Sequence, residues 1–300
     1  MRLTLTLPVV LISLCAAPAS AQELTGTLKK IKDTGTITLG HRESSVPFSY
    51  YDDKQQVVGY AMDLCYRIVD AVKSDLKLDK LEVRLNPVTS ATRIPLIANG
   101  TVDLECGSTT NNLERQKQVS FTITHFVTAN RFVSKKSANL KTVDDLRGKT
   151  VVSTSGTTNI KQITEIAAQK GLNLNIIAAK DHAEAFLMVE TGRAAAFVMD
   201  DILLYSLVAS SKSPQDYVIS ADALSVEPYA IMLPKADAPF KKVVDEAMIA
   251  TYKSGAINGI YQKWFLEPIP PKGINLNVPM SASFKKVIAS PTDSGDPAVY

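Results

Sequence analysis

The chain contains few of the residues on which metal sites and nucleophilic catalysis depend. It has 3 cysteines and 3 histidines in 300 residues, and no two of them stand at the short spacing of metal ligands. It also lacks a Gly-x-Ser-x-Gly elbow, a Walker loop and a Gly-x-Gly-x-x-Gly motif after a strand. We therefore expect no metal, no cofactor and no catalytic residue.

The chain also lacks a strong charge of either sign. Its formal net charge is +3, and Lys and Arg are scattered without a basic run. Nucleic acids are bound through concentrated positive charge, so the sequence argues against a nucleic-acid partner.

Long apolar runs are missing except at the N-terminus. Met1-Arg2 is followed by apolar residues over 3–14, and Ala19-Ser20-Ala21 has the small residues of a cleavage site. This pattern predicts a secretory signal peptide over residues 1–21, cleaved near Ala21, and an exported protein that starts near Gln22. A buried N-terminal strand or helix is the alternative. Lipid attachment at Cys15 is disfavoured, because Leu14 stands where a small residue is needed.

The remaining 280 or so residues are enough for two domains. The expected helices cover 24–34, 59–76, 89–99, 159–170 and 181–191, and the expected strands cover 35–40, 81–87, 102–106, 150–153, 174–178 and 194–199. Alternating elements of this length predict an α/β fold with mostly parallel sheets. Residues 98–106 and 190–199 each show a helix end, a glycine and a short buried strand. The same supersecondary unit therefore occurs twice, which predicts two similar lobes.

Two segments, 126–133 and 226–233, are extended and have no helical period. They suit a hinge of two strands, and the helices over 238–254 and 255–265 would then return to the first lobe. We divide the chain into lobe 1 (22–128 plus 230–271), lobe 2 (129–229) and a wrapped or partly disordered tail (272–300).

Cleavage would leave two cysteines, Cys65 and Cys106. Cys65 falls on the apolar face of a predicted helix, and Cys106 ends a predicted strand. In an oxidising compartment an even number of cysteines favours one disulfide. Two unpaired buried cysteines are the alternative.

Charged and hydroxyl side chains gather where strands end, which is where α/β folds bind ligands. They are Arg42, Ser90, Arg93, Ser108, Thr109, Thr110, Arg115, Thr158, His182, Asp200 and Asp201. Arginines beside one carboxylate suit a small ligand with two negative groups and one positive group. Each residue has a plainer alternative, such as a surface ion pair for the arginines, loop capping for Asp200 and a structural role for His182.

Several segments carry a resemblance to a known family. They are GHRESSVPFSYYD at 40–52, TSATRIPL at 89–96, ECGSTTNNLERQ at 105–116, SGTT at 155–158, AKDH at 179–182 and MDD at 199–201. Over residues 24–271 the chain resembles the periplasmic glutamate/aspartate-binding proteins, in the polar amino-acid solute-binding family of ABC importers. The resemblance implies the two-lobed periplasmic-binding-protein-like II fold, in which both lobes close on the ligand.

The same resemblance implies a role for each site residue. Arg115, Ser108 and Thr110, with Thr158, would hold the α-carboxylate of L-glutamate or L-aspartate, and Asp200 would hold the α-ammonium. The side-chain carboxylate would be bound by Arg42, Ser90, Arg93 and His182. The expected partner is the membrane permease of an ABC importer. The protein is expected to be a monomer that delivers the amino acid to this permease. An exported dehydratase with Glu105 or His182 as general acid, and a receptor's sensor domain, are the alternatives.

Overall fold

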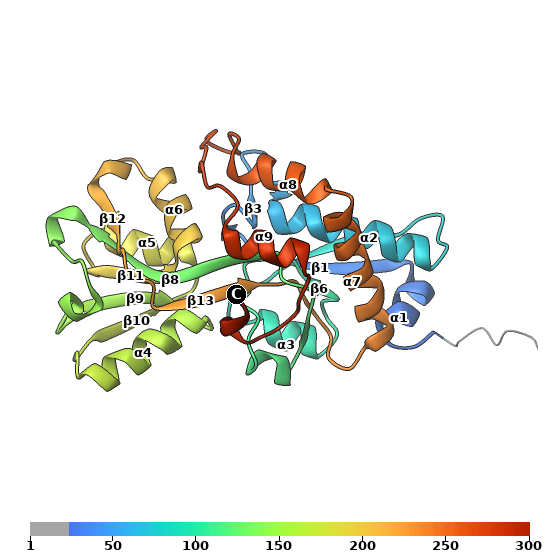
Figure 1. The fold of residues 1–300 in the computed structure, drawn as a ribbon, viewed down its shortest axis with the longest axis horizontal. Coiled ribbons are helices and arrows are strands. Elements are labelled where there is room, and N and C mark those ends of the chain that lie inside the picture. The colour runs from blue at the N-terminus through green and yellow to red at the C-terminus, as the bar shows by residue number, and fades with distance from the viewer. Residues whose placement is uncertain (1–23) are drawn as a thin grey trace, which may run out of the picture.

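The computed structural model describes residues 24–300. The predicted signal peptide, its cleavage site and Cys15 lie outside the described residues. Two sheets lie side by side, each covered by helices, and two extended strands run between them (Figure 1). We call the body built on the first sheet lobe 1 and the body built on the second sheet lobe 2.

The sheet of lobe 1 has the strand order β5-β1-β6-β14-β7. Its strands are β1 (Thr36–His41), β5 (Glu82–Pro87), β6 (Leu104–Glu105), β7 (Ser120–Phe121) and β14 (Met232–Leu233). The strands β5, β1 and β6 are parallel, whereas β14 runs antiparallel to β6 and β7. A small antiparallel sheet in the same lobe contains β2 (Ser44–Ser45), β3 (Ser49–Tyr51) and β4 (Val57–Val58).

The sheet of lobe 2 has the order β10-β9-β11-β8-β12, and β13 also pairs with β8. Its strands are β8 (Phe126–Lys135), β9 (Thr150–Thr154), β10 (Asn175–Ala179), β11 (Ala196–Asp200), β12 (Tyr217–Ile219) and β13 (Ser225–Tyr229). The strands β10, β9 and β11 are parallel, and β8 is antiparallel to its three partners. In each lobe, therefore, three parallel strands form the predicted core and the antiparallel strands are added beside them.

Helices cover both sheets, as Figure 1 shows. Lobe 1 has α1 (Gly26–Thr34), α2 (Tyr60–Asp75), α3 (Arg93–Ala98), α7 (Ala238–Lys253) and α8 (Ala256–Phe265), and lobe 2 has α4 (Thr158–Lys170), α5 (His182–Glu190) and α6 (Asp201–Ser210). As predicted, α7 and α8 return to lobe 1, where both pack on α2. None of the helices found from residue 24 onward is long and apolar enough to cross a bilayer.

The sequence did not predict α6 or β12. The segment of α6 begins with Asp201 and continues with the apolar residues Ile202, Leu203 and Leu204. Its few polar residues do not fall on one face, so it has no amphipathic period from which to recognise a helix. The three apolar side chains are buried in the core. The predicted strand at 102–106 is shorter than expected, because the N–H of Val102 bonds back to the carbonyl of Leu96 rather than to a strand.

The hinge prediction is confirmed. The chain leaves lobe 1 through β8 and returns through β13, and the two strands pair from Phe126 opposite Tyr229 to Asn130 opposite Ser225. Directly after β13, the chain enters β14 of lobe 1. An apolar cluster of aromatic rings surrounds the start of the hinge, with Phe48 and Phe265 lying 5.1 and 4.9 Å from Phe126 between ring centroids.

The C-terminal tail wraps over lobe 1 and contains a helix, α9 (Ala282–Ala289). The polar composition did not predict this helix, which buries Phe284 and Val287. Beyond it, the carbonyl of Asp293 accepts a bond from Asn111 Nδ2 at 2.8 Å, in the loop that leads to Arg115.

The predicted disulfide between Cys65 and Cys106 is present in the structure. It joins α2 to the end of β6, and the two Cα atoms lie 6.2 Å apart. Both cysteines are fully buried among apolar side chains of lobe 1. The alternative of two unpaired cysteines is therefore wrong.

Removing this disulfide should destabilise the protein. The bond closes a loop across a sequence separation of 41, so its loss restores freedom to the unfolded chain and should lower the free energy of unfolding by about 2–4 kcal/mol. Urea unfolding of the Cys65→Ala/Cys106→Ala variant measures this loss. A reductant should lower the stability of the native chain and leave the variant unchanged, and an equal response of both would contradict the prediction.

Candidate functional site

Three arginines are buried near the ends of strands in lobe 1. Arg42 directly follows β1, Arg93 begins α3, and Arg115 begins a short 3-10 helix (Arg115–Lys117) after β6. They are only 2, 2 and 7% exposed. Arg42 Nη2 donates to Ser90 Oγ at 2.8 Å, and Arg115 Nη1 donates to the carbonyl oxygen of Thr110 at 2.8 Å. These bonds fix the guanidinium groups without neutralising them.

The arginines are not members of surface ion pairs. Within residues 24–300, no carboxylate oxygen lies within 4.0 Å of the guanidinium of Arg42, Arg93 or Arg115. Glu114, the neighbour of Arg115 and its partner in the surface ion-pair alternative, pairs instead with Lys117 at 2.7 Å. The surface alternatives for these three residues are therefore wrong.

Burial lowers the pKa of all three arginines. Burial and the charge of Arg93 lower the pKa of Arg42 to about 10 and the pKa of Arg115 to about 9. Burial also lowers the pKa of Arg93, whereas the nearby charge of Glu105 raises it. Arg42 and Arg115 stay protonated at neutral pH, so repelling positive charges are concentrated here, and an anionic ligand would relieve that repulsion.

Lobe 2 contributes a buried carboxylate. Asp200 ends β11 and is 3% exposed. Its Oδ1 accepts from Asn159 Nδ2 at 2.7 Å, and its Oδ2 accepts from the hydroxyl of Tyr229. Burial and the charge of Glu227 raise the pKa of Asp200 to about 7. Although Asp200 precedes α6, its side chain makes no capping bond there and binds the side chains of Asn159 and Tyr229 instead, which contradicts the loop-capping alternative.

His182, the first residue of α5, is held as a neutral ring. Its Nδ1 lies 2.8 Å from Thr154 Oγ1, and its Nε2 is buried without a partner in the described chain. Burial, with the charges of Arg42 and Arg93, keeps the pKa of His182 well below its usual value. When Thr154 donates its hydroxyl hydrogen to Nδ1, the neutral imidazole carries its own hydrogen on Nε2 and can donate it to a ligand.

Thr158 begins α4, but its hydroxyl already has an acceptor. Thr158 Oγ1 donates to Glu227 Oε2 at 3.0 Å, while the neighbouring Thr157 caps the helix by accepting from the N–H of Ile160. The hydroxyl of Thr158 is therefore directed at Glu227. What remains available to a ligand at this position is the backbone N–H at the helix start, which favours an anion.

Five buried polar atoms around these residues have no hydrogen-bond partner within residues 24–300. Four are Arg42 Nη1, Arg93 Nε, Ser108 Oγ and His182 Nε2, and the fifth is the acceptor Glu105 Oε1. Buried donors are rarely left without acceptors, because each costs free energy. Donors from both lobes that lack acceptors mark the place where a ligand rich in acceptor oxygens would bind.

The lobes touch at the rim of this site. Arg115 Nη2 of lobe 1 donates to the carbonyl of Gly156 in lobe 2 at 3.3 Å. A Cβ placed on Gly156 would lie 2.6 Å from Ala91 Cα and 2.7 Å from the carbonyl oxygen of Ser90, so the two backbones are in close contact. The structure therefore has the closed arrangement of the lobes.

The structure gathers the predicted site residues at the facing sides of the lobes. They are Arg42, Ser90, Arg93, Ser108, Thr110 and Arg115 from lobe 1, and Thr158, His182 and Asp200 from lobe 2. Thr110 contacts Arg115 through its backbone carbonyl oxygen.

Sequence reasoning missed Asn159, Glu227 and Tyr229, and it gave Thr109 no role. Asn159 directly follows a predicted site residue, which was the available signal. Glu227 and Tyr229 stand in the second hinge segment, where nothing in the sequence connects them to Thr158 or Asp200.

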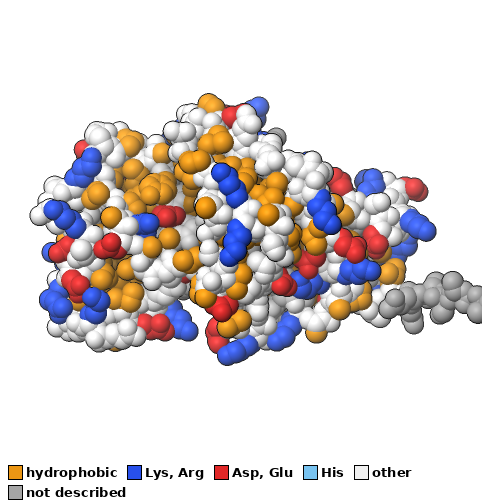
Figure 2. All heavy atoms as spheres, in the orientation of Figure 1, with side chains coloured by type: hydrophobic (Ala, Val, Ile, Leu, Met, Phe, Trp, Pro, Cys, Tyr) orange, Lys and Arg blue, Asp and Glu red, His pale blue; other side chains and the backbone are white. Residues whose placement is uncertain are grey.

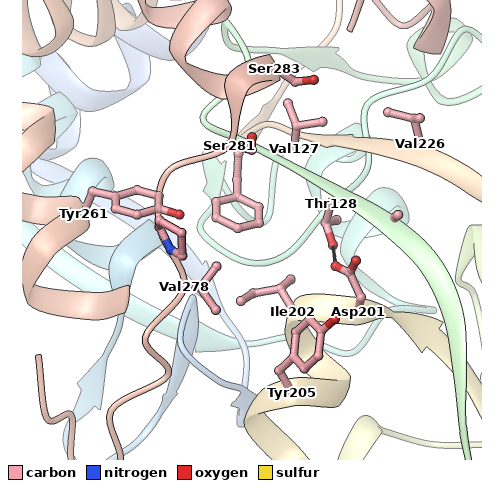
Figure 3. Close-up of a pocket in the computed structure, with 13 residues that line it drawn as sticks. Val127, Thr128, Asp201, Ile202, Tyr205, Val226, Tyr261, Val278, Ser281 and Ser283 are labelled. Atoms are coloured by element: carbon pink, nitrogen blue, oxygen red, sulfur yellow. Dashed lines mark hydrogen bonds between the residues drawn. The ribbon is translucent and has the colours of Figure 1, made fainter. Parts of the chain in front are cut away.

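Asp201 has separate surroundings from Asp200. Its carboxylate accepts from Thr128 Oγ1 at 2.5 Å and lies 3.1 Å from Arg131 Nε. In Figure 3, Asp201 points toward Thr128 in a pocket by the hinge that Tyr205 and other side chains line. Asp201 therefore forms part of the hinge structure.

Metal binding finds no support between residues 24 and 300, where no cluster of three or more histidine, cysteine or acidic side chains could hold an ion. On the face shown in Figure 2, positive and negative side chains are mixed, without a broad field of one sign. This matches the near-neutral charge of the sequence.

The family model of bacterial extracellular solute-binding proteins, family 3, matches residues 37–267. The chain belongs to this family. It is 57% identical over 285 residues to the L-glutamate/L-aspartate-binding protein of Pseudomonas aeruginosa, covering 95% of this chain and 94% of that protein. It is 46% identical over 278 residues to the glutamate/aspartate import solute-binding protein of Escherichia coli, covering 93% and 91% of the two.

Solved structures agree with the fold. An ancestral arginine-binding protein bound to arginine matches with a TM-score of 0.69 at 27% identity, over 77% of this chain and 98% of that chain. The predicted two-lobed fold is confirmed, and so is the predicted class, an extracytoplasmic solute-binding protein rather than an enzyme. The dehydratase alternative is set aside.

Proposed function

We propose that this protein captures L-glutamate or L-aspartate between its lobes and delivers it to the membrane permease of an ABC importer. The observation that carries the proposal is the charge pattern of the site. Three buried arginines without acidic ion-pair partners suit two carboxylates, and the buried carboxylate of Asp200 suits one ammonium group. The names of the relatives support the same ligands.

Each part of the ligand is assigned to its own group of residues. In our proposal, Arg115, Ser108 and Thr110 bind the α-carboxylate, with the helix start at Thr158. Asp200 binds the α-ammonium. The side-chain carboxylate is bound by Arg42, Ser90, Arg93 and His182. Charge-assisted hydrogen bonds of about 1.5–3 kcal/mol each can together reach the roughly 8 kcal/mol of a micromolar complex after the ordering costs are met.

The proposal extends to the chain as a whole. We place the signal peptide at residues 1–21 with cleavage near Ala21, and the mature protein in the periplasm as a monomer. Lobe 1 then comprises 22–128 plus 230–271, lobe 2 comprises 129–229, and the tail comprises 272–300.

Calorimetry with the purified mature protein tests the ligand. L-glutamate and L-aspartate should bind, and glutamine and asparagine should bind at least about 100-fold more weakly, because an amide leaves buried arginine charge uncompensated. Arginine and lysine serve as controls for amino acids that add positive charge, and they should give no heat of binding. Absence of heat with both acidic amino acids would refute the proposal, and equal affinity for glutamate and glutamine would refute the assignment of Arg42 and Arg93.

The proposal also predicts a dependence on pH. An ammonium group requires an ionised Asp200, whose pKa of about 7 without ligand means that it holds a proton at lower pH. Binding must then release that proton, so affinity should fall as the pH decreases, by up to about tenfold per pH unit below about 7. Calorimetry in two buffers of different ionisation heat measures the protons released. Close to one proton per bound ligand should be released near pH 6, and far less than one near pH 8. A constant affinity without proton release would contradict the assignment of Asp200.

A further inference from the structure

Thr109 lies between Arg93 and a buried carboxylate that the proposed ligand contacts do not use. Arg93 Nη1 donates to Thr109 Oγ1, and Thr109 Oγ1 donates to Glu105 Oε2 at 2.6 Å. Thr109 and Glu105 are 0% exposed, and Arg93 is 2% exposed. The three side chains therefore form a hydrogen-bonded chain that is closed to solvent.

The direction of these hydrogen bonds follows from the donors and acceptors of the three side chains. A threonine hydroxyl has one hydrogen and two acceptor lone pairs. The guanidinium of Arg93 can only donate, so the hydroxyl of Thr109 turns a lone pair to Arg93 and gives its own hydrogen to Glu105 Oε2. Arg93 Nη1 also donates to the carbonyl of Ser108 at 3.2 Å. One end of the guanidinium is thus fixed, while its Nε is buried without a partner.

Glu105 is suited to this position. Its charge acts on all three site arginines and favours their protonated forms, raising the pKa of each against the effect of burial. Gly107 leaves room for it, because a Cβ at Gly107 would lie 2.3 Å from Glu105 Oε1.

We propose that Thr109 is a positioning residue for the selection of acidic ligands over their amides. Its hydroxyl, directed by Glu105, holds the Arg93 guanidinium in the orientation that receives the second carboxylate of the ligand. This inference rests on the proposed function, in which Arg93 binds that carboxylate.

The test compares Thr109→Val with Thr109→Ser, using calorimetry with L-glutamate and competition calorimetry with L-glutamine. Thr109→Val keeps the shape of the side chain and removes the hydroxyl, so glutamate should bind about tenfold more weakly while glutamine changes by less than about twofold. Thr109→Ser restores the hydroxyl and should restore the native ratio of the two affinities. A purely structural role would weaken both ligands together and would overturn the proposal. Thermal melting checks that each variant folds, and Thr109→Ala replaces Thr109→Val if the latter does not.

The role of Glu105 is tested by combining Thr109→Val with Glu105→Gln. If the carboxylate acts through Thr109, the effect of Thr109→Val on the glutamate-to-glutamine ratio should shrink when Glu105→Gln is present, whatever the lost charge does alone. An effect of the same size in both backgrounds would show that Glu105 does not direct the hydroxyl.

A measurement without ligand separates this proposal from the proposed function. Nitrogen-15 NMR of the arginine side chains, assigned with Arg93→Lys, should show restricted rotation of the Arg93 guanidinium in the native chain and faster rotation in Thr109→Val. Equal rotation in both would overturn the positioning role even if glutamate binds. If the native chain does not bind glutamate but the rotation changes as expected, the positioning of Arg93 holds and the proposed ligand is wrong.

Discussion

Replacement of Asp200 by asparagine should nearly abolish amino-acid binding without unfolding the protein. The change removes the only negative charge proposed to face the ligand ammonium, and truncating one partner of a buried charged pair costs about 3–5 kcal/mol. The affinity for glutamate should therefore fall by at least about 100-fold in calorimetry. The free energy of unfolding of the ligand-free protein should stay constant or increase near neutral pH. This follows because burial disfavours the ionised Asp200, as its raised pKa indicates.

Asp201→Asn is the matched control for Asp200→Asn. Asp201 bonds with Thr128 and Arg131 in the hinge and has no contact with the site arginines. Its replacement should change the affinity by less than about threefold, since a partly exposed ion pair contributes about 0–1 kcal/mol. A larger loss of binding in Asp201→Asn than in Asp200→Asn would mean that the wrong aspartate has been assigned to the ammonium group.

Alanine at position 156 should prevent the lobes from closing. Gly156 has a φ of +75°, and the added Cβ would lie 2.6 Å from Ala91 Cα, which is too close for contact with backbone. Overpacking of this kind costs about 1–3 kcal/mol, and here the cost applies only when the lobes are together. Gly156→Ala should therefore weaken glutamate binding by about 10–100-fold. Small-angle scattering should show that saturating glutamate lowers the radius of gyration of the native chain but not of the variant.

Gly171→Ala controls for the backbone cost of this change. Gly171 ends α4 with a φ of +58°, and nothing lies within 4 Å of a Cβ placed there. Both variants should lose about 1 kcal/mol of unfolding free energy, because alanine disfavours this backbone region. Only Gly156→Ala should lose affinity, and equal binding by the two variants would show that the contact with Ala91 does not limit closure.

The sequence predicted those parts of the fold that depend on local patterns. The parallel strands and their helices follow from alternating apolar runs ended by glycines such as Gly100 and Gly192. The hinge follows from two extended segments without a helical period. The helix α6 could not be predicted in this way, because its sequence lacks the polar face that marks a helix.

Local patterns predict the site only as far as side chains follow strand ends, whereas the role of each site residue is implied by the family resemblance. Arg42 and Asp200 stand directly at such ends, so their place in a ligand site is visible in the sequence. Glu227 and Tyr229 belong to the site only because β13 pairs with β8 and brings them beside α4 and β11. Contacts of this kind depend on strand register across nearly 100 residues of chain, which local patterns do not encode.

The contact of Gly156 with Ser90 and Ala91 has a consequence for the timing of transport. While the lobes touch there and Arg115 reaches across, the buried arginines are shielded, so an amino acid enters only when the lobes are apart. It also leaves only after they separate. The lifetime of the complex is then set by how often the lobes open, rather than by the strength of any one hydrogen bond. A membrane partner that holds the lobes apart would empty the site without competing for any of its ligand contacts.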